Sequence, residues 1–407
     1  MSEFIVNGGA RLVGEITVGG SKNAALPIIF STIITRGVSI LYGVPDISDV
    51  SVALKLLQNM GALVLRDGEA LYIDTTTLEY SVPDESLVSK IRASSYLIGA
   101  TLSRFGRADI CRFGGCNFDN RPIDMHLCAA RALGAERLGS TLFARKLTGA
   151  DIVFDKISVG ATVNAILLSV SATGVSRIFG YAREPHVYSL IEFLNTAGAD
   201  IRCEDKYILI DGRALHGGRA RIIPDMIEAG TYLLLSVMTG DSIKVSGIAR
   251  HHLQALFDLL TDGGVSLYFD SDSVTAEGSL FKEISVVTSP YPGFPTDLQP
   301  QMAPLLATMR GGEIVETVWH SRFGYLTELS ELGVKYTLSD SCAKIEPSEL
   351  HSGIASATDL RGGAALLMAA IAAQGRSVIK NAEIINRGYE NIVNKLRSVG
   401  ADIVENN

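Results

Sequence analysis

The sequence repeats a short motif six times, and this repeat limits the folds that the chain can adopt. Each copy consists of a leucine (an alanine in the second copy), three further residues, a glycine, and then an alanine or valine. The six glycines are Gly61, Gly134, Gly198, Gly264, Gly333 and Gly400. Their spacings lie between 64 and 73 residues. A period of this kind predicts that one supersecondary unit is used six times.

A second glycine precedes each motif glycine by 22 to 28 residues and ends an apolar helix pattern. These glycines are Gly37, Gly106, Gly174, Gly240, Gly311 and Gly375. The helix before each of them has no polar face, as in ATVNAILLSVSAT (161–173), and such a helix is normally buried. The second helix of each unit is amphipathic and ends at the motif glycine, which suits a left-handed C-cap.

Short strand patterns follow the helices, for example LVLRD (63–67) and YILID (207–211). Since the first helix of each unit is apolar all round, we expect an α/β fold with helices inside and sheets outside. Six units could form a ring, a solenoid, or two globular lobes of three units each. A solenoid needs polar capping repeats, and the end units here resemble the others, so we favour two lobes with a cleft between them. We place residues 1–21 and 230–407 in one lobe and residues 22–229 in the other.

The composition is that of a globular protein, with 47% hydrophobic and 20% charged residues in a chain of 407. No apolar run approaches the roughly 18 residues that span a bilayer, and the start of the chain lacks a secretory signal. Five cysteines without paired spacing fit a reducing cytoplasm better than a disulfide framework. The net charge of −8 argues against general nucleic-acid binding. We expect a cytoplasmic protein with no membrane or nucleic-acid partner, and the sequence indicates no oligomeric state.

The second unit departs from the repeat because its two glycines are 28 residues apart, against 22 to 25 elsewhere. The additional residues fall in FGGCNFDNRPID (113–124), a polar loop with glycine hinges and one thiol. Loops that interrupt a regular scaffold often act as lids or carry active-site residues. An extended surface turn is the alternative interpretation.

Charged and hydroxyl residues recur where the apolar helices are expected to begin. Helix N-termini offer free N–H groups and the positive end of the helix dipole, and added lysine or arginine favours phosphate. Any one of these residues could be an ordinary cap or surface charge, but recurrence at equivalent repeat positions favours an anion-binding cleft. They are Lys22, Asn23, Arg92, Lys156, Ser158, Asp297, Asp359 and Arg361.

Other possible sites are weaker. His251 and His252 have no third ligand at metal spacing, so we expect no metal site. GGARLVGEITVGG (8–20) matches neither a P-loop nor a dinucleotide-binding loop, so we expect no cofactor. Four cysteines in apolar or strand contexts are interpreted as packing residues. They are Cys111, Cys128, Cys203 and Cys342.

Nine segments, all in order, resemble signature segments of the enolpyruvyl transferases, and the resemblance runs from about residue 8 to residue 402. They read GSKNAALP, GGCxxxxRPIDMH, DKISVGAT, AREP, PDMIEAGT, FPTDLQ, SRFGYLTEL, ATDLRGGAAL and NRGYE. The cysteine loop and KNAALP are similar to the branch that acts on UDP-N-acetylglucosamine, not to the shikimate branch. The resemblance implies an inside-out α/β barrel in each of two lobes, with three βαβαββ units per lobe. This fold agrees with the sixfold repeat.

The resemblance also implies a reaction, the transfer of an enolpyruvyl group from phosphoenolpyruvate to the 3-hydroxyl of UDP-N-acetylglucosamine at the start of peptidoglycan precursor synthesis. Phosphate leaves after addition and elimination, and no cofactor or metal takes part. By match to the motifs, Lys22, Arg121 and Arg387 hold phosphoenolpyruvate. Cys116 acts as general acid, or as the thiol that engages the intermediate. Asp297 takes the hydroxyl proton.

The remaining site residues are carried over by the same matching. Arg92 and Arg361 lie near phosphoenolpyruvate, Asp359 begins the same helix as Arg361, and Arg322 orders the closed cleft. The residues expected to bind the nucleotide-sugar are Asn23, Pro122, Ile123, Asp124, Met125, Lys156, Ser158, Gly160 and Val318.

Four residues depart from the family pattern: Phe118, Asp119, His186 and Met226. They represent either lineage drift or a paralogue that uses another acceptor, such as another nucleotide or shikimate 3-phosphate. A third hypothesis is a non-catalytic, repeat-built binding protein such as a DNA-encircling clamp. A clamp needs a basic inner surface made by all six units, whereas the basic residues here concentrate at particular helix starts.

Overall fold

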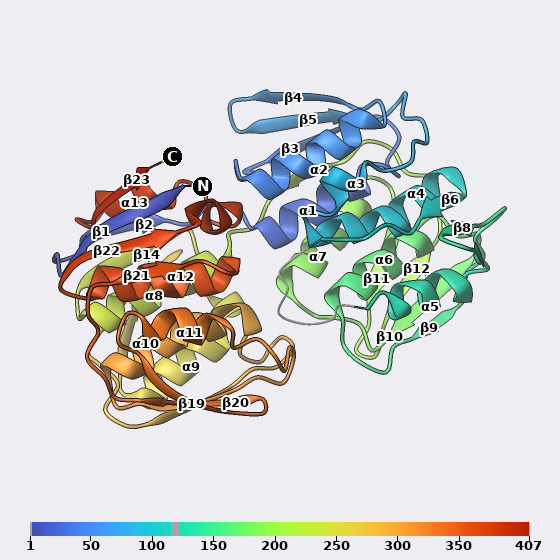
Figure 1. The fold of residues 1–407 in the computed structure, drawn as a ribbon. Coiled ribbons are helices and arrows are strands. Elements are labelled where there is room, and N and C mark those ends of the chain that lie inside the picture. Colours follow the sequence, from blue (N-terminus) through green and yellow to red (C-terminus); the bar gives the residue numbers. More distant parts are fainter. Residues whose placement is uncertain (1, 115–121, 407) are drawn as a thin grey trace. The chain divides into compact units, whose positions relative to one another are not determined.

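The computed structural model describes residues 2–114 and 122–406, which divide into two compact units (Figure 1). We call residues 2–19 and 224–406 the terminal unit, and residues 20–114 and 122–223 the central unit. The chain passes between them after Gly19 and after Ile223. The lobe boundaries expected after residues 21 and 229 stay predictions. The second division in the structure precedes helix α8 (Met226–Thr239), which is continuous and lies wholly in the terminal unit.

The terminal unit contains three four-stranded sheets, each with one parallel and two antiparallel pairs. The first sheet has the order β21 (Ile354–Ser356), β22 (Gly375–Lys380), β1 (Glu3–Gly8), β23 (Asp402–Asn406). The second has the order β15 (Ser266–Phe269), β16 (Ser273–Glu277), β14 (Ser242–Ser246), β2 (Val13–Thr17). The third has the order β17 (Ile284–Val287), β18 (Gly312–Val315), β20 (Cys342–Glu346), β19 (Lys335–Ser339).

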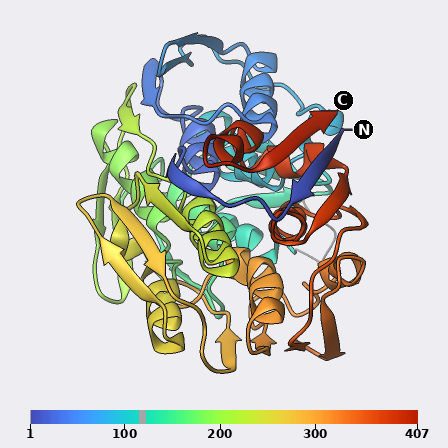
Figure 2. The same ribbon diagram turned by 90° about the vertical axis from the view of Figure 1, so that its left-hand side faces the viewer.

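The first and last strands of the described chain are neighbours in the first of these sheets. Ile5 of β1 is opposite Val378 of β22 on one side and Val404 of β23 on the other. Figure 2 shows the blue N-terminal strand among the red C-terminal strands. Residues from both ends of the sequence are therefore needed to complete this sheet.

The central unit also contains three sheets. One has the order β13 (Arg219–Arg221), β3 (Val38–Tyr42), β5 (Ala70–Asp74), β4 (Leu63–Asp67). Another has the order β11 (Asp200–Cys203), β12 (Tyr207–Asp211), β10 (Val175–Phe179), β9 (Asp151–Val153). The third has three strands in the order β6 (Arg107–Asp109), β8 (Thr141–Phe143), β7 (Glu136–Leu138). Six sheets for six sequence repeats confirm the predicted architecture.

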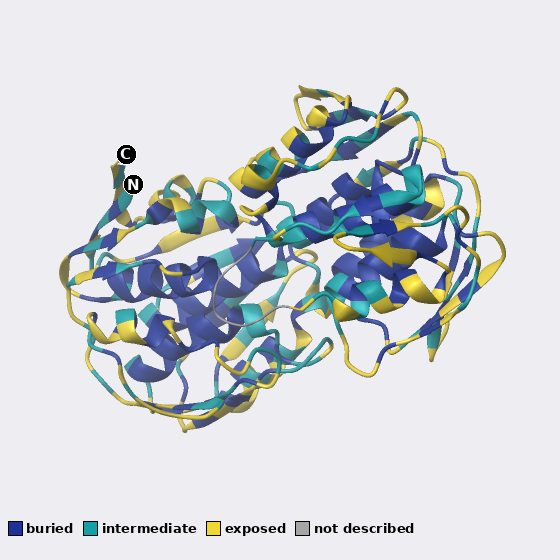
Figure 3. Cartoon of the chain, turned by 45° about the vertical axis from the view of Figure 1, so that its right-hand side comes forward, coloured by how far each residue is buried: buried dark blue, intermediate teal, exposed yellow. Residues whose placement is uncertain are grey.

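The six apolar helices form the interior of the two units, as predicted (Figure 3). They are α8, α10 (Gln299–Thr308) and α12 (Leu360–Ala372) in the terminal unit, and α1 (Lys22–Ser31), α4 (Leu97–Phe105) and α6 (Val159–Ser169) in the central unit. Residues 360–371 of α12 and residues 161–169 of α6 are buried without exception. Among the described residues, no helix combines the length and apolar character that crossing a membrane requires.

The second helix of each unit is amphipathic and lies outside the apolar helices. These helices are α2 (Ser48–Asn59), α5 (Asp124–Ala132), α7 (Pro185–Thr196), α9 (Gln254–Gly263), α11 (Tyr325–Ser330) and α13 (Ile392–Ser398). Short helical segments precede or follow several of them. They are α3 (Glu85–Val88), η1 (Arg92–Tyr96), η2 (Arg250–Leu253), η3 (Thr296–Leu298) and η4 (Ala382–Arg387).

All twelve glycines of the repeat have a positive φ, between 68° and 121°. At the six motif glycines this result confirms the left-handed C-caps that the motif predicts. For the apolar helices the prediction holds at α4 and α8, which Gly106 and Gly240 cap. It is wrong for the other four, because α1 ends at Ser31, α6 at Ser169, α10 at Thr308 and α12 at Ala372, several residues before the glycine. Residues with a Cβ atom adopt this conformation only at a cost, which explains why glycine recurs at both positions in every unit.

Replacing Gly240 by alanine tests this cost without a steric contribution. Gly240 caps α8 with φ +70°, and a Cβ atom there would meet nothing within 4 Å. We expect Gly240→Ala to lower the free energy of unfolding by about 1 kcal/mol in urea denaturation, from backbone strain alone. The matched control is Gly324→Ala, because Gly324 has equal space but a φ of −58°. Equal effects of the two substitutions would contradict the conformational explanation.

Candidate functional site

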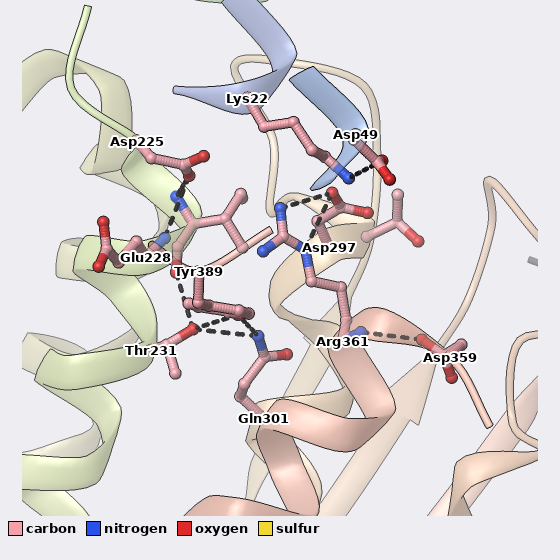
Figure 4. A network of polar contacts seen from close by, with 12 residues as sticks. Lys22, Asp49, Asp225, Glu228, Thr231, Asp297, Gln301, Asp359, Arg361 and Tyr389 are labelled. Atoms are coloured by element: carbon pink, nitrogen blue, oxygen red, sulfur yellow. Dashed lines mark hydrogen bonds and ion pairs between the residues drawn. The ribbon is translucent and has the colours of Figure 1, made fainter. Parts of the chain in front are cut away.

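In the terminal unit, the carboxylate of Asp297 lies between two buried arginines, Arg322 and Arg361. Figure 4 shows its contact with Arg361. Arg322 Nη1 donates to Asp297 Oδ1 at 2.9 Å, and Nε and Nη2 of Arg361 donate to Oδ2, each at 3.3 Å. The side chains of Arg322 and Arg361 are 4% and 1% exposed, whereas that of Asp297 is 30% exposed. The structure thus brings together three predicted site residues from separate segments and leaves the carboxylate accessible.

The two arginines remain charged despite their burial. Burial alone would lower the pKa of each guanidinium, because the charged form loses its hydration. Nearby groups outweigh this effect: Asp297 and Asp359 raise the pKa of Arg322, and Tyr389 and Asp297 raise that of Arg361. The guanidinium of Arg361 also lies over the ring of Tyr389, 5.2 Å from its centroid.

Asp359 is the N-cap of α12 and binds the first free backbone groups of that helix. Its Oδ1 accepts hydrogen bonds from the N–H groups of Arg361 and Gly362, both at 3.0 Å. Asp225 caps α8 in the same way. The carboxylates of Asp359 and Asp225 therefore bind the free N–H groups at the starts of these two helices. At a helix start without such a cap, an anionic ligand could bind the same groups. The role of Asp359 in substrate binding stays a prediction.

Glu316, which sequence reasoning missed, organises the backbone around two predicted residues. It is fully buried and accepts hydrogen bonds from Thr296, the neighbour of Asp297, and from the backbone N–H of Val318. Thr296 also accepts a hydrogen bond from Arg322. The signal that could have identified Glu316 is an acidic residue directly after a buried strand.

A second buried carboxylate, Glu228 of α8, lies where the chain leaves the terminal unit. It accepts hydrogen bonds from Lys395 Nζ at 2.6 Å, Tyr232 Oη at 3.0 Å and the backbone N–H of Gly19 at 2.8 Å. Burial raises the pKa of Glu228, and the charge of Lys395 and the Gly19 N–H oppose this rise. The backbone N–H of Asp225 in turn donates to the Gly19 carbonyl at 2.9 Å. This cluster fixes the position of Gly19.

In the central unit, Lys22 is the first residue of α1, and its Nζ lies 3.4 Å from Asp49 Oδ2. The two side chains are 13% and 6% exposed. Asn23 follows on the same turn and is half-buried. Asp49, in the first turn of α2, is an acidic partner that sequence reasoning did not identify.

Three further predicted segments of the central unit meet around a buried histidine. Arg92 begins η1, Asp124 and Met125 begin α5, and Ser158 caps α6 by accepting a hydrogen bond from the N–H of Ala161. His126 of α5 is buried among them. Burial and the charge of Arg92 lower the pKa of His126 to about 4.

The other predicted residues are less constrained. Pro122 and Lys156 are exposed, Ile123 is the residue before α5, and Arg387 ends η4 half-buried. Cys116 and Arg121 lie outside the described residues, as do Phe118 and Asp119. His186 is buried at the start of α7. Met226, the first residue of α8, packs against the core of the terminal unit.

Comparison with known proteins places this arrangement in context. A family described as EPSP synthase (3-phosphoshikimate 1-carboxyvinyltransferase) matches residues 6–396. A protein of Streptococcus agalactiae named UDP-N-acetylglucosamine 1-carboxyvinyltransferase 1 is 40% identical over 416 residues, 99% of either chain. A protein of Halothermothrix orenii named UDP-N-acetylglucosamine 1-carboxyvinyltransferase is 40% identical over 411 residues, again 99% of either chain.

Two solved structures resemble the whole chain. The enolpyruvyl transferase NikO from Streptomyces tendae has a TM-score of 0.90 with 29% sequence identity, and the match covers 100% of this chain and 99% of NikO. An EPSP synthase from Acinetobacter baumannii has a TM-score of 0.74 with 16% identity over the full length of both chains. The second likeness concerns the fold alone.

The lowered pKa of His126 predicts a loss of stability in acid. The unfolded chain binds a proton near pH 6.5, whereas the folded chain binds it only near pH 4. The contribution of His126 to stability is therefore complete above pH 6.5 and is lost as the pH falls toward 4. We expect wild-type protein to lose about 2 kcal/mol more than His126→Leu between pH 7 and pH 5, measured by urea unfolding. Parallel pH profiles of the two proteins would refute this assignment.

The Glu228–Lys395 pair predicts a large loss of stability when the lysine is removed. Lys395→Met leaves Glu228 buried without its counter-charge, which should cost about 3 kcal/mol of unfolding free energy. Lys244→Met is the matched control, because Lys244 pairs with Glu15 at 3.8 Å and both side chains are about half exposed. We expect the control to cost less than about 1 kcal/mol. A similar cost for both variants would argue against a buried ion pair at Glu228.

Proposed function

Because the chain belongs to the EPSP synthase family of enolpyruvyl transferases, we propose that it transfers the enolpyruvyl group of phosphoenolpyruvate to UDP-N-acetylglucosamine. The acceptor atom is the 3-hydroxyl of the sugar, and phosphate is the second product. Whole-chain identity of 40% to proteins named for this reaction supports the choice of acceptor. The observation that carries the chemistry is Asp297, held between two buried arginines and open to solvent.

Asp297 is the proposed base for the acceptor hydroxyl. Attack of this hydroxyl on C2 of phosphoenolpyruvate requires that its proton leave as the C–O bond forms, and a positioned carboxylate can accept that proton. Three hydrogen bonds from Arg322 and Arg361 fix the orientation of the carboxylate before substrate arrives. The same arginines compensate its charge.

The anionic donor requires cations and a proton source. Phosphoenolpyruvate carries a carboxylate and a phosphate, which arginine and lysine bind well. Family resemblance assigns this work to Lys22, Arg121 and Arg387. It assigns protonation of the methylene carbon to Cys116, whose thiol would be acidified by neighbouring cations. Loss of phosphate from C2 of the tetrahedral adduct, together with a proton from the adjacent methyl carbon, then restores the double bond and gives the enolpyruvyl ether.

The proposed compartment is the cytoplasm. The four described cysteines, Cys111, Cys128, Cys203 and Cys342, are free thiols. Free thiols persist in a reducing compartment, and a catalytic thiol would need the same conditions.

A phosphate-release assay with three acceptors tests the proposed function. UDP-N-acetylglucosamine, UMP and shikimate 3-phosphate are offered separately with phosphoenolpyruvate. We expect release with UDP-N-acetylglucosamine only, which would leave His186 and Met226 as lineage drift. Release with another acceptor only would keep the mechanism and replace the substrate. No release with any acceptor would refute the enzymatic proposal.

Two variants separate the proposed catalytic roles from folding. Asp297→Asn keeps the shape of the side chain but removes the base, so we expect kcat to fall at least about 100-fold with an unchanged circular dichroism spectrum. Cys116→Ala should abolish or severely reduce turnover in the same assay. Near-normal turnover of either variant would exclude the role assigned to that residue. Met226→Arg is the third comparison, and an unchanged acceptor KM would identify that departure as neutral.

A further inference from the structure

A buried hydrogen-bond network in the central unit joins α5 and the start of α6. Apart from α1, these are the described segments of the unit that carry predicted nucleotide-sugar residues. The centre of the network is Asn164 of α6, which is fully buried. Asn164 Oδ1 accepts a hydrogen bond from the N–H of Gly99 in α4 at 2.6 Å. Its Nδ2 lies 2.7 Å from His126 Nδ1 and 3.2 Å from the Ser95 carbonyl oxygen in η1. One amide side chain thus contacts η1, α4 and α5 from α6.

The network fixes the protonation state of His126. The N–H of Gly99 can only donate, so the atom of Asn164 that faces it must be the oxygen. The amide nitrogen therefore faces His126, and since that nitrogen can only donate, His126 Nδ1 must accept. The imidazole is consequently the neutral tautomer with its proton on Nε2. A neutral ring also avoids repulsion with Arg92, whose charge acts on it.

The ring of His126 also lies directly against the start of α6. A Cβ atom added to Gly160 would be 3.1 Å from His126 Cε1 and 3.3 Å from Nε2. The carbonyl of Gly160 accepts a hydrogen bond from Asn164 Nδ2 at 3.2 Å. Gly160 and Ser158 are predicted to bind the nucleotide-sugar, and His126 follows Met125, another predicted contact, in the sequence. The ring of His126 therefore packs α5, which carries the predicted contact Met125, against the start of α6, which carries the predicted contacts Ser158 and Gly160.

We propose that His126 and Asn164 are positioning residues for the nucleotide-sugar: they fix the starts of α5 and α6, which carry its predicted contacts, relative to one another. This inference rests on the proposed function and adds to it two residues that carry no assigned role. Neither residue performs chemistry. Their effect is to pre-organise Asp124, Met125 and Ser158, so that binding the acceptor does not have to order two separate segments.

Steady-state kinetics of His126→Leu tests the proposal. Leucine removes the acceptor for Asn164, so we expect KM for UDP-N-acetylglucosamine to rise about tenfold, while kcat and KM for phosphoenolpyruvate change less than about twofold. His126→Asn can place its carbonyl oxygen near the position of Nδ1, so it should return KM to within about threefold of wild type.

Ser103→Ala is the matched control. Ser103 Oγ donates to the Leu167 carbonyl at 2.9 Å, so it joins the same helices, α4 and α6, nearer their C-terminal ends. We expect this variant to lower the unfolding temperature slightly and to leave KM unchanged. An equal rise of KM in Ser103→Ala and His126→Leu would overturn the proposal, because the effect would then reflect a nonspecific loss of packing between the helices. An unchanged KM in His126→Leu would also overturn the proposal. The same holds if His126→Asn does not return KM for UDP-N-acetylglucosamine toward the wild-type value.

Calorimetric titration of UDP-N-acetylglucosamine separates this inference from the proposed function. If wild type binds the nucleotide-sugar but releases no phosphate, the catalytic proposal fails, and a roughly tenfold weaker Kd for His126→Leu still supports the positioning role. If His126→Leu does not fold, His126→Gln replaces it, because glutamine has no acceptor at the Nδ1 position. Wild-type affinity in a folded His126→Gln protein would likewise overturn the proposal.

Discussion

The six central helices have no polar face, and most of the structure follows from this constraint. A helix that is apolar all round must be covered on every side, which explains why amphipathic helices and sheets surround each of them. Its only unsatisfied backbone groups are at its two ends. At the C-terminal ends of α4 and α8, glycines with positive φ end the helix and turn the chain away. At the N-terminal ends, free N–H groups require side-chain partners, so polar residues collect there.

Buried polar groups are held in place by two physical means: ion pairs, which occur in both units and include Lys22–Asp49 in the central unit, and a neutral network in the central unit. In the terminal unit, full charges are paired: Asp297 with Arg322 and Arg361, and Glu228 with Lys395. In the central unit, the network around Asn164 is neutral, because His126 is held without a charge. Paired charges lose much of their hydration and depend on geometry, whereas a neutral network depends on each donor meeting an acceptor. Removing one member is therefore costly in both units.

The repeat allowed much of the fold to be predicted, because its two glycines and its apolar helices are local features. The residues that meet around Asp297 could not be predicted from spacing, since Arg322 and Arg361 lie 25 and 64 positions further along the chain. Resemblance to a family named them instead. Glu316, Lys395 and Asn164 were missed because each acts through a tertiary contact that no local pattern encodes. The roles of Cys116 and Arg121 stay predictions from resemblance.

The position of β1 between β22 and β23 has a consequence for synthesis of the chain. The described residues of the central unit all lie between residues 20 and 223, and they can form their sheets as they emerge. Strand β1 precedes every other described strand in the sequence, but the strands beside it begin only at Gly375 and Asp402. Its backbone hydrogen-bond partners are therefore synthesised only after the whole described central unit. During that interval the apolar residues of β1, Phe4 and Val6, lack the core that later buries them.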